Sequence, residues 1–234
     1  MSHGESPLAL FEDLLLLPGG PGERGGANGY AILARGRMLL VDTVFRAQLE
    51  AARALRAEGF VPAALVLTHR HPAAQANALR AVHAELAVPV YLHPADAAHP
   101  QARNKGIDFR DPTVPDALLA AFGVEARHFP GHTEGHVLLR WKAHGGVLFA
   151  GNAAAGGAAP GELTRPPAAF SHDDERLRRG WAAFRGQAAA LCPFHGAPLI
   201  GRADLPRLLR ALAEPLSSVA ARESEPSIDT VGCP

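Results

Sequence analysis

Short apolar segments occur as neighbours in both the first and the second part of this chain, and helical segments lie between them. The strand-like segments are residues 14–17, 30–33, 38–41, 64–67, 88–92, 124–129, 137–141, 147–150 and 191–193. The segments with helical spacing are residues 47–58, 73–86, 116–122, 173–190 and 204–212. Because each part supplies paired strands of its own, the sequence predicts a layered α/β domain built on two sheets.

The 234 residues contain neither an internal repeat nor a linker between domains. We therefore predict a single domain over residues 1–213, followed by a polar tail over residues 214–234. A long loop is predicted over residues 151–167. Its part from residue 153 to residue 167 is rich in Ala, Gly and Pro, which predicts a mobile surface loop rather than a domain boundary.

The composition excludes several classes of protein. Hydrophobic residues make up 47% of the chain and charged residues 20%, which is typical of a globular protein and not of a disordered one. The 23 basic and 23 acidic residues cancel, which argues against a nucleic-acid binder or a membrane-surface protein. No apolar run approaches the roughly 18 residues of a membrane span and no signal peptide is recognisable, so we expect a cytoplasmic protein. The two cysteines cannot form a disulfide framework or a Cys-rich zinc site.

Four of the twelve histidines follow predicted strands directly. His69 and His71 follow the segment 64–67, His132 lies in a Gly-flanked turn, and His195 follows the segment 191–193. Because residues at the carboxyl ends of strands project into the crevice where α/β proteins bind ligands, these four side chains could converge on one site.

The spacing of His128, His132 and His136 by four residues suggests one face of a helix, but the intervening Pro130 and two glycines oppose a helix there. We therefore reject a helical zinc-protease motif. The remaining histidines are predicted to be surface or packing residues; those considered individually are His93, His99, His128, His136, His144 and His172.

Taken together, these segments resemble the metallo-β-lactamase superfamily, in particular its glyoxalase-II-like branch, from about residue 14 to residue 212. The matching motifs occur in the family's order: Asn28-Gly-Tyr30, Leu40-Val-Asp42-Thr43, Thr68-His69-Arg70-His71, Val90-Tyr-Leu-His93-Pro-Ala-Asp96, Phe129-Pro-Gly-His132-Thr-Glu-Gly-His136, Leu148-Phe-Ala-Gly151-Asn152 and Phe194-His195-Gly196. The resemblance implies a four-layer αββα sandwich, in which two mixed sheets are flanked by helices.

The chain departs from the family's metal motif at three positions. Ala73 and Ala74 stand where the family has Asp and His, and Asn152 stands where it has a bridging Asp. The resemblance therefore implies one metal site rather than two, with His69, His71 and His132 as ligands and Asn152 as a neutral oxygen beside them. Three imidazoles with an open position suit zinc, and iron is less favoured because its usual carboxylate is missing. The same losses leave open that no metal is bound.

The resemblance also suggests roles for residues around the ion. We expect Asp42 to steady a ligand histidine and His195 to orient water or substrate. Arg165, the cation of the segment 151–167, could meet an acidic substrate.

The leading functional hypothesis is a hydrolase of a small ester, thioester or lactone with a single three-His zinc site. The alternative is a catalytically degraded family member that binds a small ligand or a partner in the same cleft. An iron-dependent sulfur dioxygenase is disfavoured because Asn152 replaces a carboxylate. The expected partner is a small molecule, with neither nucleic acid nor membrane, and a homodimer is left open.

Overall fold

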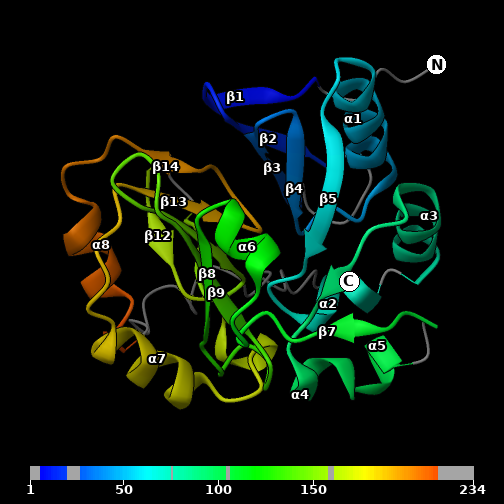
Figure 1. The fold of residues 1–234 in the computed structure, drawn as a ribbon. Helices are drawn as coiled ribbons and strands as arrows, with labels where there is room; N and C mark the ends of the chain where they lie inside the picture. The colour runs from blue at the N-terminus through cyan, green and yellow to red at the C-terminus, as the bar shows by residue number, and fades with distance from the viewer. Residues whose placement is uncertain (1–5, 20–26, 75, 104–105, 158–160, 216–234) are drawn as a thin grey trace, which may run out of the picture.

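The computed structural model describes residues 6–19, 27–74, 76–103, 106–157 and 161–215. Two large sheets face each other, and helices cover the outer face of each sheet (Figure 1). Most of the predicted polar tail and part of the Gly-rich turn between the first two predicted strands lie outside the described residues.

The first sheet contains seven strands, and their spatial order follows their order in the sequence. They are β1 (Leu8–Phe11), β2 (Leu14–Pro18), β3 (Asn28–Ala34), β4 (Arg37–Val41), β5 (Val61–Val66), β6 (Val90–Tyr91) and β7 (Phe109–Arg110). The pairs from β1 to β4 are antiparallel, and those from β4 to β7 are parallel. The helices of this half are α1 (Arg46–Ala57), α2 (Arg70–Ala74), α3 (Ala76–Leu86), α4 (Pro94–Ala97) and α5 (Pro100–Arg103).

The second sheet contains five strands in the order β14-β13-β10-β9-β8. They are β8 (Val124–His128), β9 (Val137–Trp141), β10 (Val147–Gly151), β13 (Ala190–Pro193) and β14 (Leu199–Ile200). Only the β10–β13 pair of this sheet is parallel. The other elements are α6 (Ala117–Ala121), the hairpin of β11 (Ala155–Gly156) and β12 (Leu163–Thr164), the short 3₁₀ helix η1 (Ala168–Phe170), α7 (Asp174–Ala183) and α8 (Leu205–Ala211).

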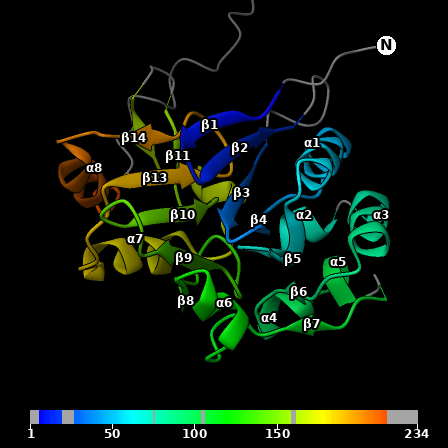
Figure 2. The same ribbon diagram turned by 45° about the horizontal axis from the view of Figure 1, so that its top comes forward.

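Three apolar layers hold this arrangement together. Alternate residues of β4 point to opposite faces of the sheet, so Leu40 packs with α1 and α3 while Leu39 packs against the second sheet. In β10, Phe149 faces the first sheet and Leu148 faces α7 and α8. Figure 2 shows the same order of layers from another side, with α1 and α3 on one flank and α7 and α8 on the other. The predicted four-layer αββα sandwich is therefore confirmed.

Some predicted boundaries were wrong. The helix predicted over residues 173–190 ends at Ala183, because Phe184 is extended, with φ −68° and ψ 123°. The helix predicted over residues 73–86 starts earlier, since α2 begins at Arg70, and α3 ends at Leu86 as predicted. The segment 151–167, predicted as a loop, contains the β11–β12 hairpin. None of the described helices combines the length and the apolar character needed to cross a membrane.

Backbone hydrogen bonds join the two halves at the edge where the predicted site residues lie. The amide of Val137 donates to the carbonyl of Thr68 at 2.8 Å, and the amide of Asn28 donates to the carbonyl of Phe194 at 2.7 Å. These bonds fix the turn after β5 to the start of β9 and the turn after β13 to the start of β3. The strand ends that carry the histidines are thus held next to one another.

The layer between the sheets predicts a clear stability effect. Phe149 is 1% exposed and packs edge-to-face on Tyr30, with ring centroids 5.3 Å apart. Replacing Phe149 by Ala should lower the free energy of unfolding by about 3–5 kcal/mol, since a cavity would remain between the sheets. Phe170 is 70% exposed, and its replacement by Ala should change stability by less than about 0.5 kcal/mol. Denaturant unfolding of both variants tests this difference, and equal effects would contradict the layered core.

Candidate metal centre

Three histidines from both halves of the fold converge on one point. His69 lies in the turn after β5, His71 in the first turn of α2, and His132 in the loop between β8 and β9. One ligand nitrogen from each lies within 4.8 Å of the other two, and Nδ1 of His71 is 2.9 Å from Nε2 of His132. The structure thus brings together the three residues that the sequence suggested as ligands.

The state of these imidazoles suits a metal ion. Burial, followed by repulsion from the neighbouring histidines, lowers the pKa of His69 well below its ordinary value and that of His132 to about 2. Burial also lowers the pKa of His71. The three rings are therefore neutral near pH 7, which is the form that binds metals. Nε2 of His69 is buried and has no hydrogen-bond partner within the described part of the chain. A buried nitrogen without a partner is costly, and an ion would satisfy it.

A hydrogen-bonded relay fixes the orientation of His69. Oδ1 of Asp42 accepts the Thr68 amide at 2.8 Å, and Oδ2 accepts the Thr68 hydroxyl at 2.7 Å. The Thr68 hydroxyl oxygen lies 2.9 Å from Nδ1 of His69. Because its single hydrogen goes to Asp42, that oxygen accepts a hydrogen from Nδ1, which leaves Nε2 with a free lone pair. The Asp42 carboxylate is therefore linked to His69 through Thr68 and not by direct contact.

The backbone and environment of Asp42 are unusual. Its φ of +51° lies in the left-handed region, which Asp tolerates better than most residues. Burial raises the pKa of its carboxyl group to about 7, although the two hydrogen bonds from Thr68 oppose this shift. Its carboxylate is therefore ionised above about pH 7.

Asp96 is part of the site, although no role was expected for it from the sequence. It is fully buried on α4 and accepts hydrogen bonds from Arg70, Thr133 and Gly135. These partners are neighbours of the ligand histidines, at sequence separations of 26 to 39 residues from Asp96. The sequence placed Asp96 only at the end of the segment Val90-Tyr-Leu-His93-Pro-Ala-Asp96, and that segment does not reveal contacts with distant turns.

His195 lies beside the three histidines but outside the group of converging nitrogens. Its ring packs on Phe194 with centroids 4.8 Å apart, and the Phe194 ring packs on His69 at 5.3 Å. The Asn28 side chain donates to the carbonyls of Pro193 and Gly196 at 3.0 and 2.7 Å, and the Tyr30 hydroxyl donates to Pro193 at 2.6 Å. The Asn28-Gly-Tyr30 segment therefore holds the turn that carries His195.

The structure also places Ala73 and Asn152, two of the positions where the resemblance led us to expect other residues. Ala73 is fully buried in the apolar layer beneath α1 and α3. Oδ1 of Asn152 is buried without a hydrogen-bond partner among the residues described. Within that same part of the chain, the three-histidine group contains no carboxylate.

His136 lies closer to the centre than a surface residue would. It is fully buried, as a packing residue would be, and its ring stacks on His69 with centroids 5.5 Å apart. Gly151 allows this packing, since its φ is +50° and a Cβ there would lie 2.3 Å from the Thr68 hydroxyl oxygen and 2.8 Å from Nε2 of His136. The end of β10 therefore packs directly against the Thr68 hydroxyl group and the His136 ring.

Arg165 was expected to meet an acidic substrate, but its side chain is buried among structural partners. It is 2% exposed, and its guanidinium group donates to the Asp174 carboxylate at 3.2 and 3.3 Å. It also donates to the carbonyls of Leu212 and Glu214, the latter at 2.6 Å. These bonds tie the β12 segment to α7 and to the end of α8, a structural role that the sequence did not reveal.

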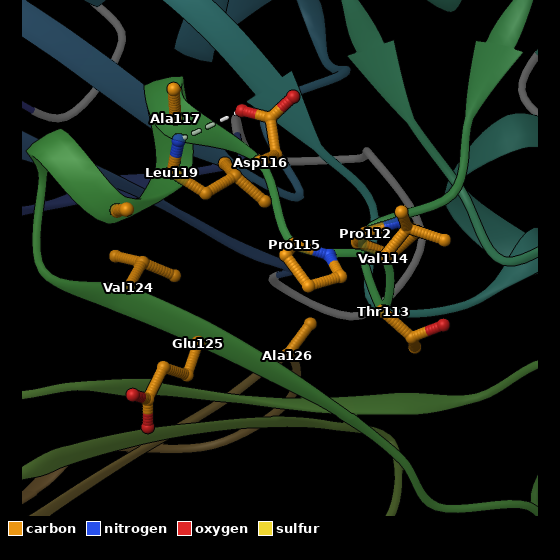
Figure 3. Close-up of a pocket in the computed structure, with 11 residues that line it drawn as sticks. Pro112, Thr113, Val114, Pro115, Asp116, Ala117, Leu119, Val124, Glu125 and Ala126 are labelled. Carbon is orange, nitrogen blue, oxygen red and sulfur yellow. Dashed lines mark hydrogen bonds between the residues drawn. The ribbon is translucent and has the colours of Figure 1, made fainter.

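A hollow of about 520 Å³ is formed by other segments than those that carry the three histidines. Its walls come from residues 112–117, α6 and β8. Figure 3 shows Val124 and Pro115 at this hollow, with Asp116 bonded to the amide of Leu119 at the start of α6. The hollow carries none of the predicted chemistry.

The relay predicts the tautomer of His69. In Asp42→Asn, the amide oxygen can still accept the Thr68 amide, while the new NH₂ group must donate to the Thr68 hydroxyl oxygen. The hydroxyl hydrogen then turns to Nδ1 of His69, and the ring proton moves to Nε2. Nitrogen-15 NMR of the chelator-treated protein at pH 8.5 should show an Nδ1–H tautomer in the parent and an Nε2–H tautomer in the variant. Thr68→Ser, which keeps the hydroxyl group, should behave as the parent; an unchanged tautomer in Asp42→Asn would contradict the relay.

Comparison with known proteins adds evidence from structure alone. No family model and no curated protein sequence matches the chain. Among solved structures, it is similar to the DIM-1 metallo-β-lactamase, with 18% identity, a TM-score of 0.69 and coverage of 88% of this chain and 95% of that one. A metallo-β-lactamase from Erythrobacter litoralis gives 19% identity, a TM-score of 0.65 and coverage of 88% and 95%. A metallo-β-lactamase family protein from Thermus thermophilus gives 21% identity, a TM-score of 0.59 and coverage of 88% of this chain and 78% of that one. The chain therefore has the metallo-β-lactamase fold.

Proposed function

We propose that this protein is a metal-dependent hydrolase whose single ion is held by His69, His71 and His132. The observation that carries the proposal is the convergence of three neutral imidazole nitrogens, with Nε2 of His69 buried and without a partner in the described residues. Imidazole nitrogens suit zinc best among the common hydrolytic metals, and zinc is the ion we propose.

The residues of the chain supply positioning and proton handling. Bound at these nitrogens, zinc would polarise a carbonyl group and lower the pKa of a coordinated water to about 7. Asp42 and Thr68 hold His69 with its Nε2 lone pair facing the other two rings. His195 stands on Phe194 at the edge of the group, where it can orient the substrate or accept a proton.

The substrate class that we propose is a small ester, thioester or lactone. The motifs that resemble the glyoxalase-II-like branch support this choice. Phe194 packs on His69 but is only 5% exposed and belongs to the apolar layer of the first sheet. It therefore supports the His69 ring and does not itself select among these substrates.

One observation favours a second candidate, a protein that binds a metal ion or a ligand at the same histidine centre without hydrolysing it. Ala73 is buried in an apolar layer, and Asn152 offers only a neutral oxygen, so the histidine group lacks a carboxylate in the described structure. A carboxylate is the group that usually orients or deprotonates the attacking water. This candidate predicts metal or ligand binding with little or no turnover.

The metal content of the purified protein tests whether the three histidines bind an ion. Protein purified without chelator should contain close to one equivalent of zinc by elemental analysis, and a His69→Ala/His132→Ala variant should contain less than about a tenth of that. His144→Ala is the matched control, since His144 stacks on Phe11 and bonds to Asp13 and does not belong to the histidine group. A metal-free parent that takes up no zinc on titration would overturn the proposed function. Hydrolysis should then be assayed on thioesters, lactones and activated esters.

Replacing Asn152 by Asp separates the two candidates. The variant restores a charged oxygen at a position whose side-chain oxygen is already buried and unsatisfied in the described structure. Zinc affinity should rise about tenfold or more, which corresponds to about 1.4 kcal/mol. If the parent hydrolyses neither a thioester nor a lactone and the variant hydrolyses one of them, the parent is a binding protein. If both hydrolyse at similar rates, the parent is already an enzyme.

A further inference from the structure

Asp96 connects the two turns that supply the metal ligands, although it belongs to neither. We propose that Asp96 is a positioning residue that sets the distance between the His69–His71 turn and the His132 turn, and thereby the affinity of the centre for its ion. This inference rests on the proposed function, since it concerns the same three histidines.

The four hydrogen bonds of Asp96 are divided between the two turns. On the first-sheet side, Oδ2 accepts the Arg70 amide at 2.8 Å and Oδ1 accepts Nη1 of Arg70 at 2.9 Å. Arg70 stands between His69 and His71 in the chain. On the second-sheet side, Oδ2 accepts the Thr133 hydroxyl at 2.6 Å and Oδ1 accepts the Gly135 amide at 2.9 Å. Each carboxylate oxygen thus bonds once to each turn.

The surroundings of Asp96 leave its carboxylate little freedom. The Asp96 side chain is fully buried, and its ion-pair partner Arg70 is 11% exposed. Charge-assisted hydrogen bonds are strong in a buried place, because water does not compete there for the carboxylate. Gly135 closes the contact, because a Cβ at that position would lie 2.6 Å from the Asp96 amide nitrogen and 2.8 Å from its carboxyl carbon. Only glycine permits the turn to approach Asp96 this closely.

The helix that carries Asp96 is itself attached to the second sheet. Nδ1 of His93 accepts the amide of Ala95 at 3.2 Å and caps α4. The His93 ring stacks on that of His128, the last residue of β8, with centroids 4.1 Å apart and an angle of 10° between the rings. The loop to His132 begins directly after this strand. The helix α4 thus follows β6 of the first sheet and packs through His93 on β8 of the second, so that Asp96 lies between the two histidine turns.

The first test is the zinc affinity of Asp96→Asn, measured by titration of chelator-treated full-length protein. Either orientation of the new amide places an NH₂ group against the amide of Arg70 or of Gly135, so at least one turn must move. We expect zinc to bind 10–100-fold more weakly, as is typical when an outer residue that orients ligands is lost. Asp111→Asn is the matched control, because Asp111 bonds only to Thr113 among the contacts described, at 2.9 and 2.7 Å. Its affinity should equal that of the parent.

A second variant keeps the carboxylate and moves the turn. Gly135→Ala should displace the His132 turn and weaken zinc binding in the same way, and the visible spectrum of the cobalt-substituted protein should change in both variants. Circular dichroism of the metal-free proteins checks that they are folded. If Asp96→Asn does not fold, Thr133→Val, which removes one of the four bonds, takes its place and should weaken zinc binding several-fold.

The outcomes separate this inference from the proposed function. Folded variants with the parent's zinc affinity and cobalt spectrum would overturn the role of Asp96 while leaving the metal centre intact. A parent that binds no zinc would instead overturn the proposed function, and the role of Asp96 with it.

Discussion

The apolar layer between the two sheets is the constraint on which the rest of this structure depends. Residues such as Tyr30, Leu39 and Phe149 are buried there because alternate residues of each strand face the opposite sheet. Since both sheets must bury this face against each other, the ends of their strands meet along a common edge. The backbone bonds from Val137 to Thr68 and from Asn28 to Phe194 then fix that edge in register. The histidine turns are close together as a consequence of this packing.

Buried carboxylates convert this proximity into a defined geometry. Asp42 and Asp96 are both buried, and both accept hydrogen bonds from neighbours of the ligand histidines. Neither belongs to the group of converging ligand atoms. In this chain, therefore, carboxylates hold the frame of the centre, and neutral imidazoles form its inner surface. The hydrogen bonds of this frame involve neither Ala73 nor Asn152, the two positions where the resemblance led us to expect aspartates.

The sequence predicted what depends on local pattern. Apolar runs such as residues 137–141 identified the strands, and the histidines that follow strands identified the three converging residues. It did not predict contacts that depend on distant partners. Asp96 meets residues 26 to 39 positions away, and Arg165 meets carbonyls 47 and 49 positions away, so neither role has a local signature. The end of α7 at Ala183 was also missed, because the alanine-rich sequence beyond it favours a helix while Phe184 turns away from one.

The three neutral imidazoles also determine how the centre would appear to a ligand from outside. A divalent ion bound there would have no carboxylate in direct contact, so its double charge would be compensated less than in a centre with an aspartate ligand. The chain has a formal net charge of zero, so its overall charge does not offset that of the ion. Small anions such as carboxylates, phosphate or thiolates would therefore compete with a neutral ester for the open position. Inhibition by the acidic product would then be an inherent property of such a centre.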